Sequence, residues 1–214
     1  MSIFSDISDN LQRGRVKAVC ELIKQAIVEN ISAKDILELG LLDGMNIVGV
    51  KFKNDELYVP EVMIAARAMK AGTELLWSLL AGEGVKASGK VCIGTVKGDM
   101  HDIGKNLVRM MMESKGLEVI DLGTNVAPEQ FLKVAIEKNC DVIACSALLT
   151  TTMGNMREVV ETAKSLGYRE KIKIMVGGAP VTEEFCQSIG ADSYTPDAAS
   201  AAEVALEFCK LNKT

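Results

Sequence analysis

The sequence predicts an α + α/β protein, in which a helical bundle is followed by a domain with a parallel sheet. Residues 1–80 show only the three- and four-residue spacing of apolar side chains that amphipathic helices have. A small and polar stretch, residues 81–89, interrupts this pattern. Beyond it, short apolar runs alternate with segments of helical length, which is typical of strands joined by crossover helices. We therefore expect two domains, at residues 1–87 and 88–214.

The N-terminal part is expected to form a four-helix bundle. A short helix precedes residue 12, and a second one carries an apolar stripe along residues 16–27. Ser32 and Asp35 resemble a capping box at the start of a third helix. Pro60 fits the first turn of a fourth, long helix, because an amide hydrogen is not needed there.

The second part is expected to form a flavodoxin-like, doubly wound sheet of five parallel strands. Its apolar runs are nearly continuous, as in strands that helices cover on both faces. Ligands of such folds bind at the carboxyl ends of the strands, commonly beside the first and third. The expected strands are Val91–Val96, Glu118–Leu122, Asp141–Ala147, Lys173–Val176 and Asp192–Tyr194. The expected helices lie near residues 103–115, 128–139, 152–166, 181–189 and 198–211.

Composition excludes several classes of protein. Hydrophobic residues make up 48% and charged residues 25% of the chain, which is typical of a globular domain. The net charge is −5 and the basic residues are scattered, which argues against a nucleic-acid binder. No secretory signal and no apolar run of roughly 20 residues is visible, so we expect no membrane span. Six cysteines without a CxxC pair indicate reduced thiols of a cytoplasmic protein.

The loop after the first expected strand contains the only histidine of the chain, His101. A metal-binding imidazole usually donates its second N–H to a carboxylate, and Asp99 lies two residues away. The alternative is an ordinary polar cluster on a surface loop. Asp-x-His by itself does not decide between the two, but Gly104 completes an Asp-x-His-x-x-Gly motif at the place where this fold binds ligands. The sequence therefore favours a ligand site.

Two other strand ends carry candidate residues. Ser146, Thr150 and Thr152 follow the third strand, where hydroxyl groups can bond a ligand or simply cap the next helix. Gly177 and Gly178 end the fourth strand, where they allow a ligand to approach the backbone or form a tight turn. For each of these residues alone, both interpretations stay open.

Other sites for this fold fit these residues poorly. A flavodoxin needs a phosphate loop rich in glycine and hydroxyl groups, and residues 97–99 do not provide one. A phosphoacceptor receiver needs an aspartate where Ser146 stands. A hydrolase using Ser146 lacks the G-x-S-x-G elbow. Zinc is not expected, since one histidine and dispersed cysteines do not form a site.

Together, the three motifs resemble the signature of cobalamin-binding domains. Residues 89–106 are especially similar to the B12-binding module of methionine synthase and of methyltransferase corrinoid proteins. Residues 44–52, 58–62 and 65–70 resemble the helical cap that precedes this module. The motifs are Asp99-x-His101-x-x-Gly104, Ser146-x-Leu148 and Gly177-Gly178.

The resemblance implies a corrinoid whose own base has left cobalt, with His101 as the lower axial ligand. Asp99 would accept the His101 N–H, and Thr152 would bond Asp99; methionine synthase has serine there. Ser146 and Thr150 would contact the buried nucleotide tail. The remaining cofactor contacts that the resemblance implies are Gly98, Met100, Asp102, Ile103, Gly104 and Leu148.

The resemblance also implies contacts at the two ends of the cofactor. Gly177 and Gly178 would leave space for the benzimidazole. Phe52 and Val59 align with cap positions over the upper, methyl-bearing face, although Val59 is smaller than the leucine of the family. The cap would have to move for partners to reach the methyl group, and residues 81–89, with their glycines, would be the hinge.

The implied function is that of a methyl carrier, not a stand-alone enzyme. The protein would accept a methyl group on Co(I) from a substrate:corrinoid methyltransferase. It would deliver that group to a second methyltransferase acting on a thiol or tetrahydrofolate, and a reductive activation protein would serve it. His101 would bind methylated cobalt and leave on demethylation, with Asp99 stabilising a proton on the free imidazole.

The methyl donor is not fixed by the sequence. Methylated amines are favoured over quaternary amines, methanol and methoxy-aromatics by overall likeness alone. Two alternatives stay open: a cobalamin-dependent sensor, which usually has a DNA-binding domain, and an adenosylcobalamin mutase subunit, which usually lacks the cap. A methyl or aqua upper ligand would identify a carrier, and an adenosyl ligand would identify the alternatives.

Overall fold

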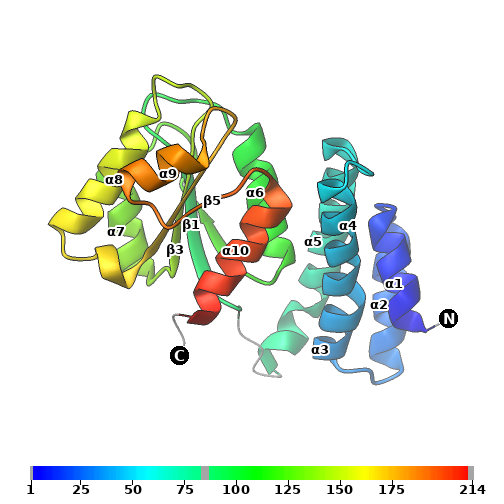
Figure 1. Cartoon of the computed structure of the whole chain (residues 1–214). Coiled ribbons are helices and arrows are strands. Elements are labelled where there is room, and N and C mark those ends of the chain that lie inside the picture. Colours follow the sequence, from blue (N-terminus) through cyan, green and yellow to red (C-terminus); the bar gives the residue numbers. More distant parts are fainter. Residues whose placement is uncertain (1, 83–86, 212–214) are drawn as a thin grey trace. The chain divides into compact units, whose positions relative to one another are not determined.

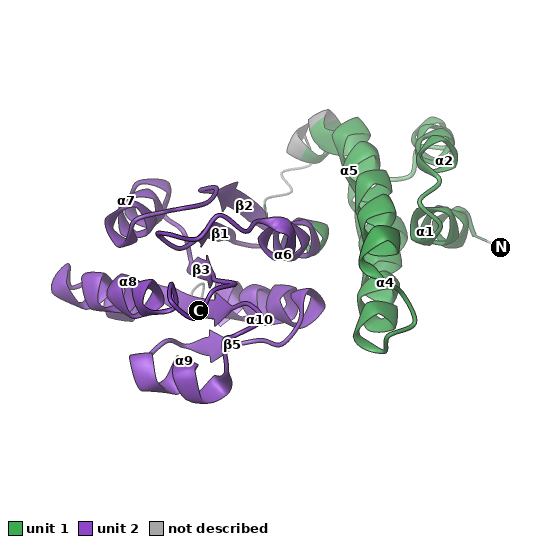
Figure 2. Cartoon of the chain, turned by 90° about the horizontal axis from the view of Figure 1, so that it is seen from above, with its two compact units in different colours: residues 1–87, 114–116 green, residues 88–113, 117–214 purple. Residues whose placement is uncertain are grey.

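The computed structural model describes residues 2–82 and 87–211 (Figure 1). The chain divides into two compact units (Figure 2). A helical unit comprises residues 1–87 with 114–116, and an α/β unit comprises 88–113 with 117–214. This architecture confirms the predicted fold class.

The helical unit contains the four expected helical segments. The predicted helix starts hold: the Ser32 side chain accepts a hydrogen bond from the Asp35 amide (3.0 Å), and Pro60 lies in the first turn of α5. The third segment is continuous from residue 33 to 53. The elements are α1 Ile3–Gln12, α2 Val16–Val28, α3 Ala33–Asp35, η1 Ile36–Leu42, α4 Asp43–Lys53 and α5 Val59–Gly82.

The η1 segment is π-helical, which the sequence pattern did not predict. Apolar side chains that are three and four residues apart share a face in an α-helix and nearly so in a single π turn. Gly40, inside η1, lies so close to Ile7 of α1 that a Cβ atom would be 3.1 Å from Ile7 Cγ2. The wider turn thus occurs where α1 and the third segment approach each other closely.

The α/β unit is built on a parallel sheet with the strand order β2-β1-β3-β4-β5. Thr95 at the end of β1 is paired with Ser146 at the end of β3, which is paired with Gly177 of β4. The order reverses between β1 and β3, so the predicted switch point is confirmed. The strands are β1 Lys90–Thr95, β2 Glu118–Asp121, β3 Val142–Ser146, β4 Lys173–Gly177 and β5 Ser193–Tyr194.

Helices cover both faces of this sheet. Figure 2 shows α6 and α10 on one face and α7, α8 and α9 on the other. The α8 helix begins two residues later than expected, so Thr152 lies in the turn that precedes it. The helices are α6 Ile103–Ser114, α7 Pro128–Lys138, α8 Gly154–Ser165, the short 3₁₀ turn η2 Arg169–Lys171, α9 Glu183–Ile189 and α10 Ala198–Leu211.

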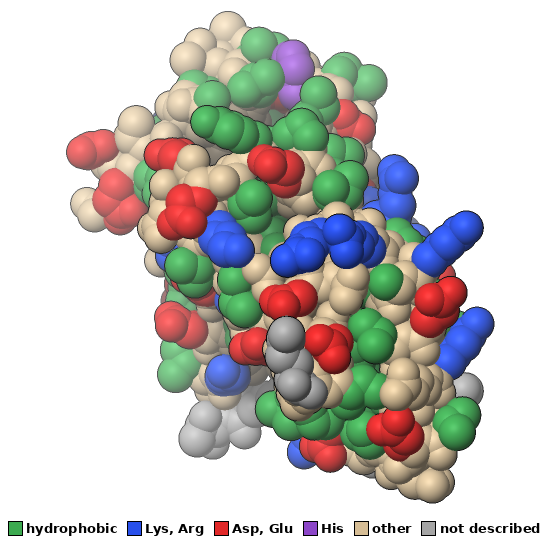
Figure 3. Space-filling model, turned by 90° about the vertical axis from the view of Figure 1, so that its right-hand side faces the viewer, with side chains coloured by type: hydrophobic (Ala, Val, Ile, Leu, Met, Phe, Trp, Pro, Cys, Tyr) green, Lys and Arg blue, Asp and Glu red, His purple; other side chains and the backbone are tan. Residues whose placement is uncertain are grey.

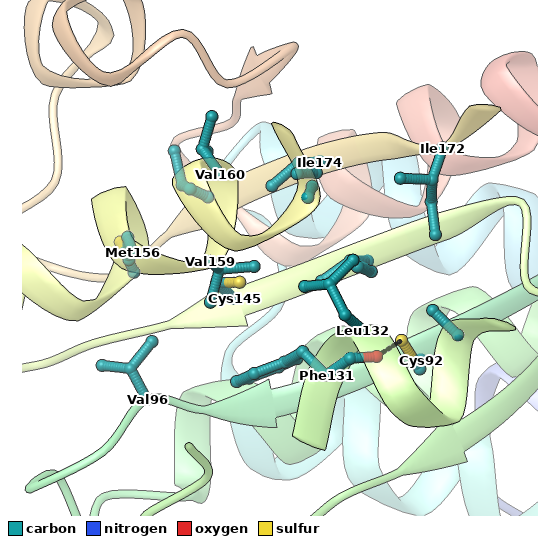
Figure 4. Close-up of a cluster of buried hydrophobic side chains, with 14 of the residues drawn as sticks. Cys92, Val96, Phe131, Leu132, Cys145, Met156, Val159, Val160, Ile172 and Ile174 are labelled. Atoms are coloured by element: carbon teal, nitrogen blue, oxygen red, sulfur yellow. Dashed lines mark hydrogen bonds between the residues drawn. The ribbon is translucent and has the colours of Figure 1, made fainter. Parts of the chain in front are cut away.

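The core of the α/β unit lies between the sheet and helices α7 and α8 (Figure 4). Phe131 and Leu132 of α7 are fully buried against the strands. A Cβ atom at Gly94 of β1 would lie 2.8 Å from Phe131 Cζ, so the ring fills the space above that glycine. The cysteines are free thiols and five of the six are buried, which agrees with the expected reduced state.

The expected hinge lies partly outside the described residues, which exclude 83–86. Gly89 is described and is tightly packed, since a Cβ atom there would lie 2.3 Å from Cys209 Cβ of α10. Its carbonyl accepts the Glu118 amide at 2.9 Å. Packing in the α/β unit therefore explains this glycine without a hinge. Among the described helices, none is both long and apolar enough to cross a membrane.

Candidate functional site

The site lies in the loop between β1 and α6, at the carboxyl edge of the sheet. The carboxylate of Asp99 is fully buried and receives hydrogen bonds on both oxygens. Its Oδ1 accepts the His101 main-chain N–H (3.1 Å) and lies 2.7 Å from His101 Nδ1. Its Oδ2 accepts bonds from the main-chain N–H groups of Leu148 (2.8 Å) and Leu149 (3.1 Å) and from Thr152 Oγ1 (3.0 Å). The structure thus joins the loops after β1 and β3 at one carboxylate.

These bonds keep Asp99 ionised. Burial raises the pKa of a carboxyl group, but the bonds from the His101 ring and from the His101, Leu148 and Leu149 amides outweigh it. The net effect holds the pKa of Asp99 well below its usual range. The ionised carboxylate accepts only, so the ring nitrogen facing it, Nδ1, must carry a proton.

The other ring nitrogen of His101, Nε2, is then left with a lone pair. The His101 side chain is 51% exposed, and its purple surface is visible in Figure 3. The neighbouring residues of both loops present apolar side chains to solvent: Met100, Ile103, Leu148 and Leu149 are 41–77% exposed. The arrangement is a single nitrogen donor within an apolar surface.

A metal at His101 would have few protein ligands. The described residues contain no group of three or more His, Cys, Asp or Glu side chains that could hold an ion. The donor therefore suits a metal that brings its other ligands with it, as one held in a macrocycle does.

The remaining residues of the loop have different surroundings. Asp102 Oδ2 accepts a bond from Asn106 Nδ2 (3.1 Å) in the first turns of α6. Gly98 has a positive φ of 80°, which a glycine adopts without strain. At Gly104 a Cβ atom would meet nothing within 4 Å, so neither packing nor a positive φ explains this glycine.

The two glycines after β4 differ. A Cβ atom at Gly178 would lie 1.9 Å from the Ala147 carbonyl oxygen, and φ is 129°, so the fold itself requires glycine there. At Gly177 the nearest atom to a Cβ would be the Thr195 carbonyl oxygen at 3.9 Å, which is an ordinary van der Waals contact. Of these two glycines, Gly177 would therefore accept a methyl group and Gly178 would not.

The other predicted residues lie as follows. Ser146 is half-buried at the end of β3, and its carbonyl accepts the Val96 amide at 3.0 Å. Thr150 is exposed in the turn before α8. Phe52, in the last turn of α4, and Val59, the first residue of α5, are partly buried in the helical unit, which is described by itself.

Three side chains that the sequence analysis missed hold the backbone of the His101 loop. Thr95 Oγ1 donates to the His101 carbonyl (2.8 Å), and Asn155 Nδ2 donates to the Lys97 carbonyl (3.0 Å). Asn125 Oδ1 accepts the Gly98 amide (2.8 Å). Polar residues at the neighbouring strand ends were the available signal, but their spacing does not reveal such bonds.

Comparison with known proteins agrees with this geometry. Two family models, both described as B12 binding domains, match residues 89–205 and 3–76. The chain is 43% identical over 205 residues to dimethylamine corrinoid protein 2 of Methanosarcina acetivorans, covering 95% of this chain and 93% of that protein. It is 44% identical over 198 residues to dimethylamine corrinoid protein 1 of Methanosarcina mazei, covering 92% and 90%.

Solved structures give the same result. The methanol:cobalamin methyltransferase complex of Methanosarcina barkeri contains a chain with a TM-score of 0.87 and 28% identity, covering 99% of this chain and 83% of that one. A cobalamin-binding protein of Desulfitobacterium hafniense matches with a TM-score of 0.81 and 28% identity, covering 97% and 98%. Both similarities extend over the two units.

Proposed function

This chain belongs to the family of corrinoid proteins with B12-binding domains, and on that premise we propose that it carries methyl groups between partner methyltransferases. The carrier would hold its corrinoid through Nε2 of His101. The observation that supports this most strongly is the buried Asp99 carboxylate, 2.7 Å from His101 Nδ1. It leaves Nε2 as the one ring nitrogen with a lone pair for a metal.

The residues of the α/β unit fit such a cofactor in three ways. His101 would be the metal ligand, with Asp99 and Thr152 behind it. The apolar side chains around the imidazole would exclude water from the imidazole once a bound corrinoid covers them. The absence of a side chain at Gly177 and Gly178 would let a buried tail approach the backbone there, and Ser146 and Thr150 would contact that tail. When bound, the corrinoid supplies a cobalt atom that takes up and releases a methyl group.

Asp99 would control the histidine ligand. Its charge holds the proton at Nδ1, which fixes the ring tautomer and makes Nε2 a stronger donor. The backbone amides of Leu148 and Leu149 would keep Asp99 ionised throughout, because their bonds do not depend on the state of the imidazole.

We assign residues 1–87 to a helical cap and residues 88–214 to the cobalamin-binding domain. Phe52 and Val59 of the cap would cover the methyl-bearing side of the cofactor. The family models support the assignment, since they match residues on either side of this boundary.

The partners would be a substrate:corrinoid methyltransferase, a second methyltransferase acting on a thiol or tetrahydrofolate, and a reductive activation protein. Among the possible methyl donors we favour a methylated amine. The relatives described above, at 43% and 44% identity, are dimethylamine corrinoid proteins, whereas the chain of the methanol complex is 28% identical.

A transfer assay tests this function. The protein is loaded with hydroxocobalamin, reduced, and mixed with a dimethylamine methyltransferase or with a methanol methyltransferase, each with its isotope-labelled substrate. We expect label on the corrinoid of the native protein with the first enzyme, and none with a His101→Ala chain. Label from methanol alone would contradict the donor, and no label from any methyl donor would contradict the carrier function.

A further inference from the structure

The main chain of His101 is held from the strand side by a residue outside the Asp-x-His motif. Thr95 is the last residue of β1 and is fully buried. Its hydroxyl donates a hydrogen bond to the His101 carbonyl at 2.8 Å. The Thr95 amide donates to the Gly123 carbonyl and its carbonyl accepts the Val126 amide, both at 2.9 Å. Thr95 is thus fixed by the loop after β2 and in turn fixes the loop after β1.

The chemistry of a buried threonine accounts for this bond. A β-branched side chain fits a strand, and its hydroxyl must find a partner when it is buried. The partner here is a carbonyl six residues further along the chain, so the bond folds the loop back onto the end of β1. The residue whose carbonyl is held is the one that carries the imidazole.

We propose that Thr95 is a positioning residue that sets the direction of the His101 imidazole. Asp99 Oδ1 holds the ring at Nδ1 and the main chain at the His101 N–H. Thr95 holds the same residue at its carbonyl. Without the hydroxyl, His101 keeps its contacts with Asp99 but its main chain gains freedom to turn, so that the direction of Nε2 is no longer fixed.

This inference rests on the proposed function for its consequence at a metal, but its effect on the ring is expected without any ligand. Thr95→Val keeps the shape of the side chain and removes the hydroxyl. Thr95→Ser keeps the hydroxyl and removes a methyl group, so it separates the hydrogen bond from packing. Thr162→Val is a matched control, because Thr162 donates to the Glu158 carbonyl (2.7 Å) within α8 and does not contact the loop.

The first readout is nuclear magnetic resonance of the ligand-free chains with nitrogen-15 histidine. Since His101 is the only histidine, the spectrum reports its tautomer and its amide exchange without assignment. In the valine variant we expect the Nδ1 proton to stay, because Asp99 still holds it, and the His101 amide to exchange roughly fivefold faster, the effect of one lost hydrogen bond. The serine variant and Thr162→Val should resemble the native protein. If the valine chain does not fold, Thr95→Cys replaces it, because a thiol is a weak hydrogen-bond donor. Its His101 amide should then exchange faster than in the serine variant, but less than fivefold faster than in the native protein.

The second readout is the electron paramagnetic resonance spectrum of the Co(II) corrinoid in the loaded chains. The spectrum gives the fraction of cobalt that is bound by histidine. In Thr95→Val we expect this fraction to correspond to roughly tenfold weaker binding of His101 to cobalt. Native amide exchange and native ligation in that variant would overturn the proposal, as would a serine variant that is disturbed as much as valine. If native protein binds corrinoid without a histidine nitrogen, the proposed function fails, whereas the ligand-free spectra still decide the role of Thr95.

Discussion

Two aspartates at the carboxyl edge of the sheet have different bonding partners. Asp121 ends β2, and Asp99 lies in the loop after the neighbouring strand β1. Asp121, the last residue of β2, binds the buried Lys105 ammonium at 2.7 and 2.8 Å and Arg109 at 3.0 Å. Asp99, in the loop after β1, is bonded by the His101 ring, by main-chain amides and by a hydroxyl, and by no Lys or Arg side chain of the described residues. One carboxylate is paired with Lys and Arg side chains, and the other faces a histidine ring.

This difference separates a structural network from a functional one. The pKa of both aspartates is lowered, although burial opposes it in each case. For Asp121 the opposing groups include two cations, whose charges cancel its own. Asp99 has no such cation beside it in the described part of the chain and faces a half-exposed imidazole, and buried carboxylates with a lowered pKa are concentrated at functional sites. We therefore expect variants at Asp121 to change stability and variants at Asp99 to change ligation.

The largest effect on stability is expected for Lys105→Met. It leaves the Asp121 carboxylate without its main partner, which for a buried pair costs about 2–3 kcal/mol once the partly exposed position of Asp121 is considered. Hydrogen exchange of the β1 and β3 amides should show this loss. Trp77, the only tryptophan, lies in the helical unit, so its fluorescence during urea unfolding serves as the control. Native exchange in the sheet would show that the pair is not structural.

Asp99→Asn is expected to cost about 1–2 kcal/mol of stability and also to weaken ligation. Its amide oxygen can still accept the three bonds from the β3–α8 loop, which turns its NH₂ group toward Nδ1. The imidazole must then move its proton to Nε2, which removes the metal donor. We expect roughly 10–100-fold weaker histidine ligation, measured by corrinoid titration. Asp121→Asn is the matched variant, and equal weakening in both would remove the distinction between the carboxylates.

Acid is expected to destabilise the α/β unit through both networks. A carboxyl group whose pKa is lower in the folded state contributes stability above its unfolded pKa and loses it as the pH falls. The free energy of unfolding should therefore decline below about pH 5 and decline less steeply in the Asp99→Asn chain. Urea unfolding at several pH values tests this. An identical decline in native and variant chains would show that Asp99 is not held ionised.

The smallest effect is expected at Asn125. This residue has a positive φ of 55°, and its side chain accepts the Gly98 amide. Asn125→Gly keeps the backbone conformation and loses an exposed hydrogen bond, so we expect a cost of about 0.5 kcal/mol. Asn139→Gly, at another residue with positive φ (52°), is the matched control. Faster exchange of the Gly98 amide in the first variant only would confirm the role of the side chain.

Most of the fold could be predicted because apolar periodicity determines which segments become strands and helices. All five strands lie where the pattern placed them, and β5 is shorter by one residue. The π turn of η1 could not be predicted, since its side chains keep nearly the same face. Glycine is required at position 178, but the reason is the close Ala147 backbone and not space for a ligand.

The contact of Asp99 with His101 and Thr152 was predicted from a resemblance, and the structure brings these three side chains together. The bonds made by Thr95, Asn125 and Asn155 were not predicted. They join side chains to backbone atoms of another loop, and such bonds require the final fold before any pattern reveals them. Backbone donors such as Leu148 N are independent of residue type, so no sequence motif marks them.

The most direct test of the account is the spectrum of the Co(II) form loaded with corrinoid, recorded by electron paramagnetic resonance. Samples are prepared with natural and with nitrogen-15 histidine, and the label is unambiguous because His101 is the only histidine. We predict that the axial nitrogen splitting changes from a triplet to a doublet in the labelled protein. A splitting that the label leaves unchanged would mean that another nitrogen binds the cobalt, and it would contradict the role of His101 and of the buried Asp99 behind it.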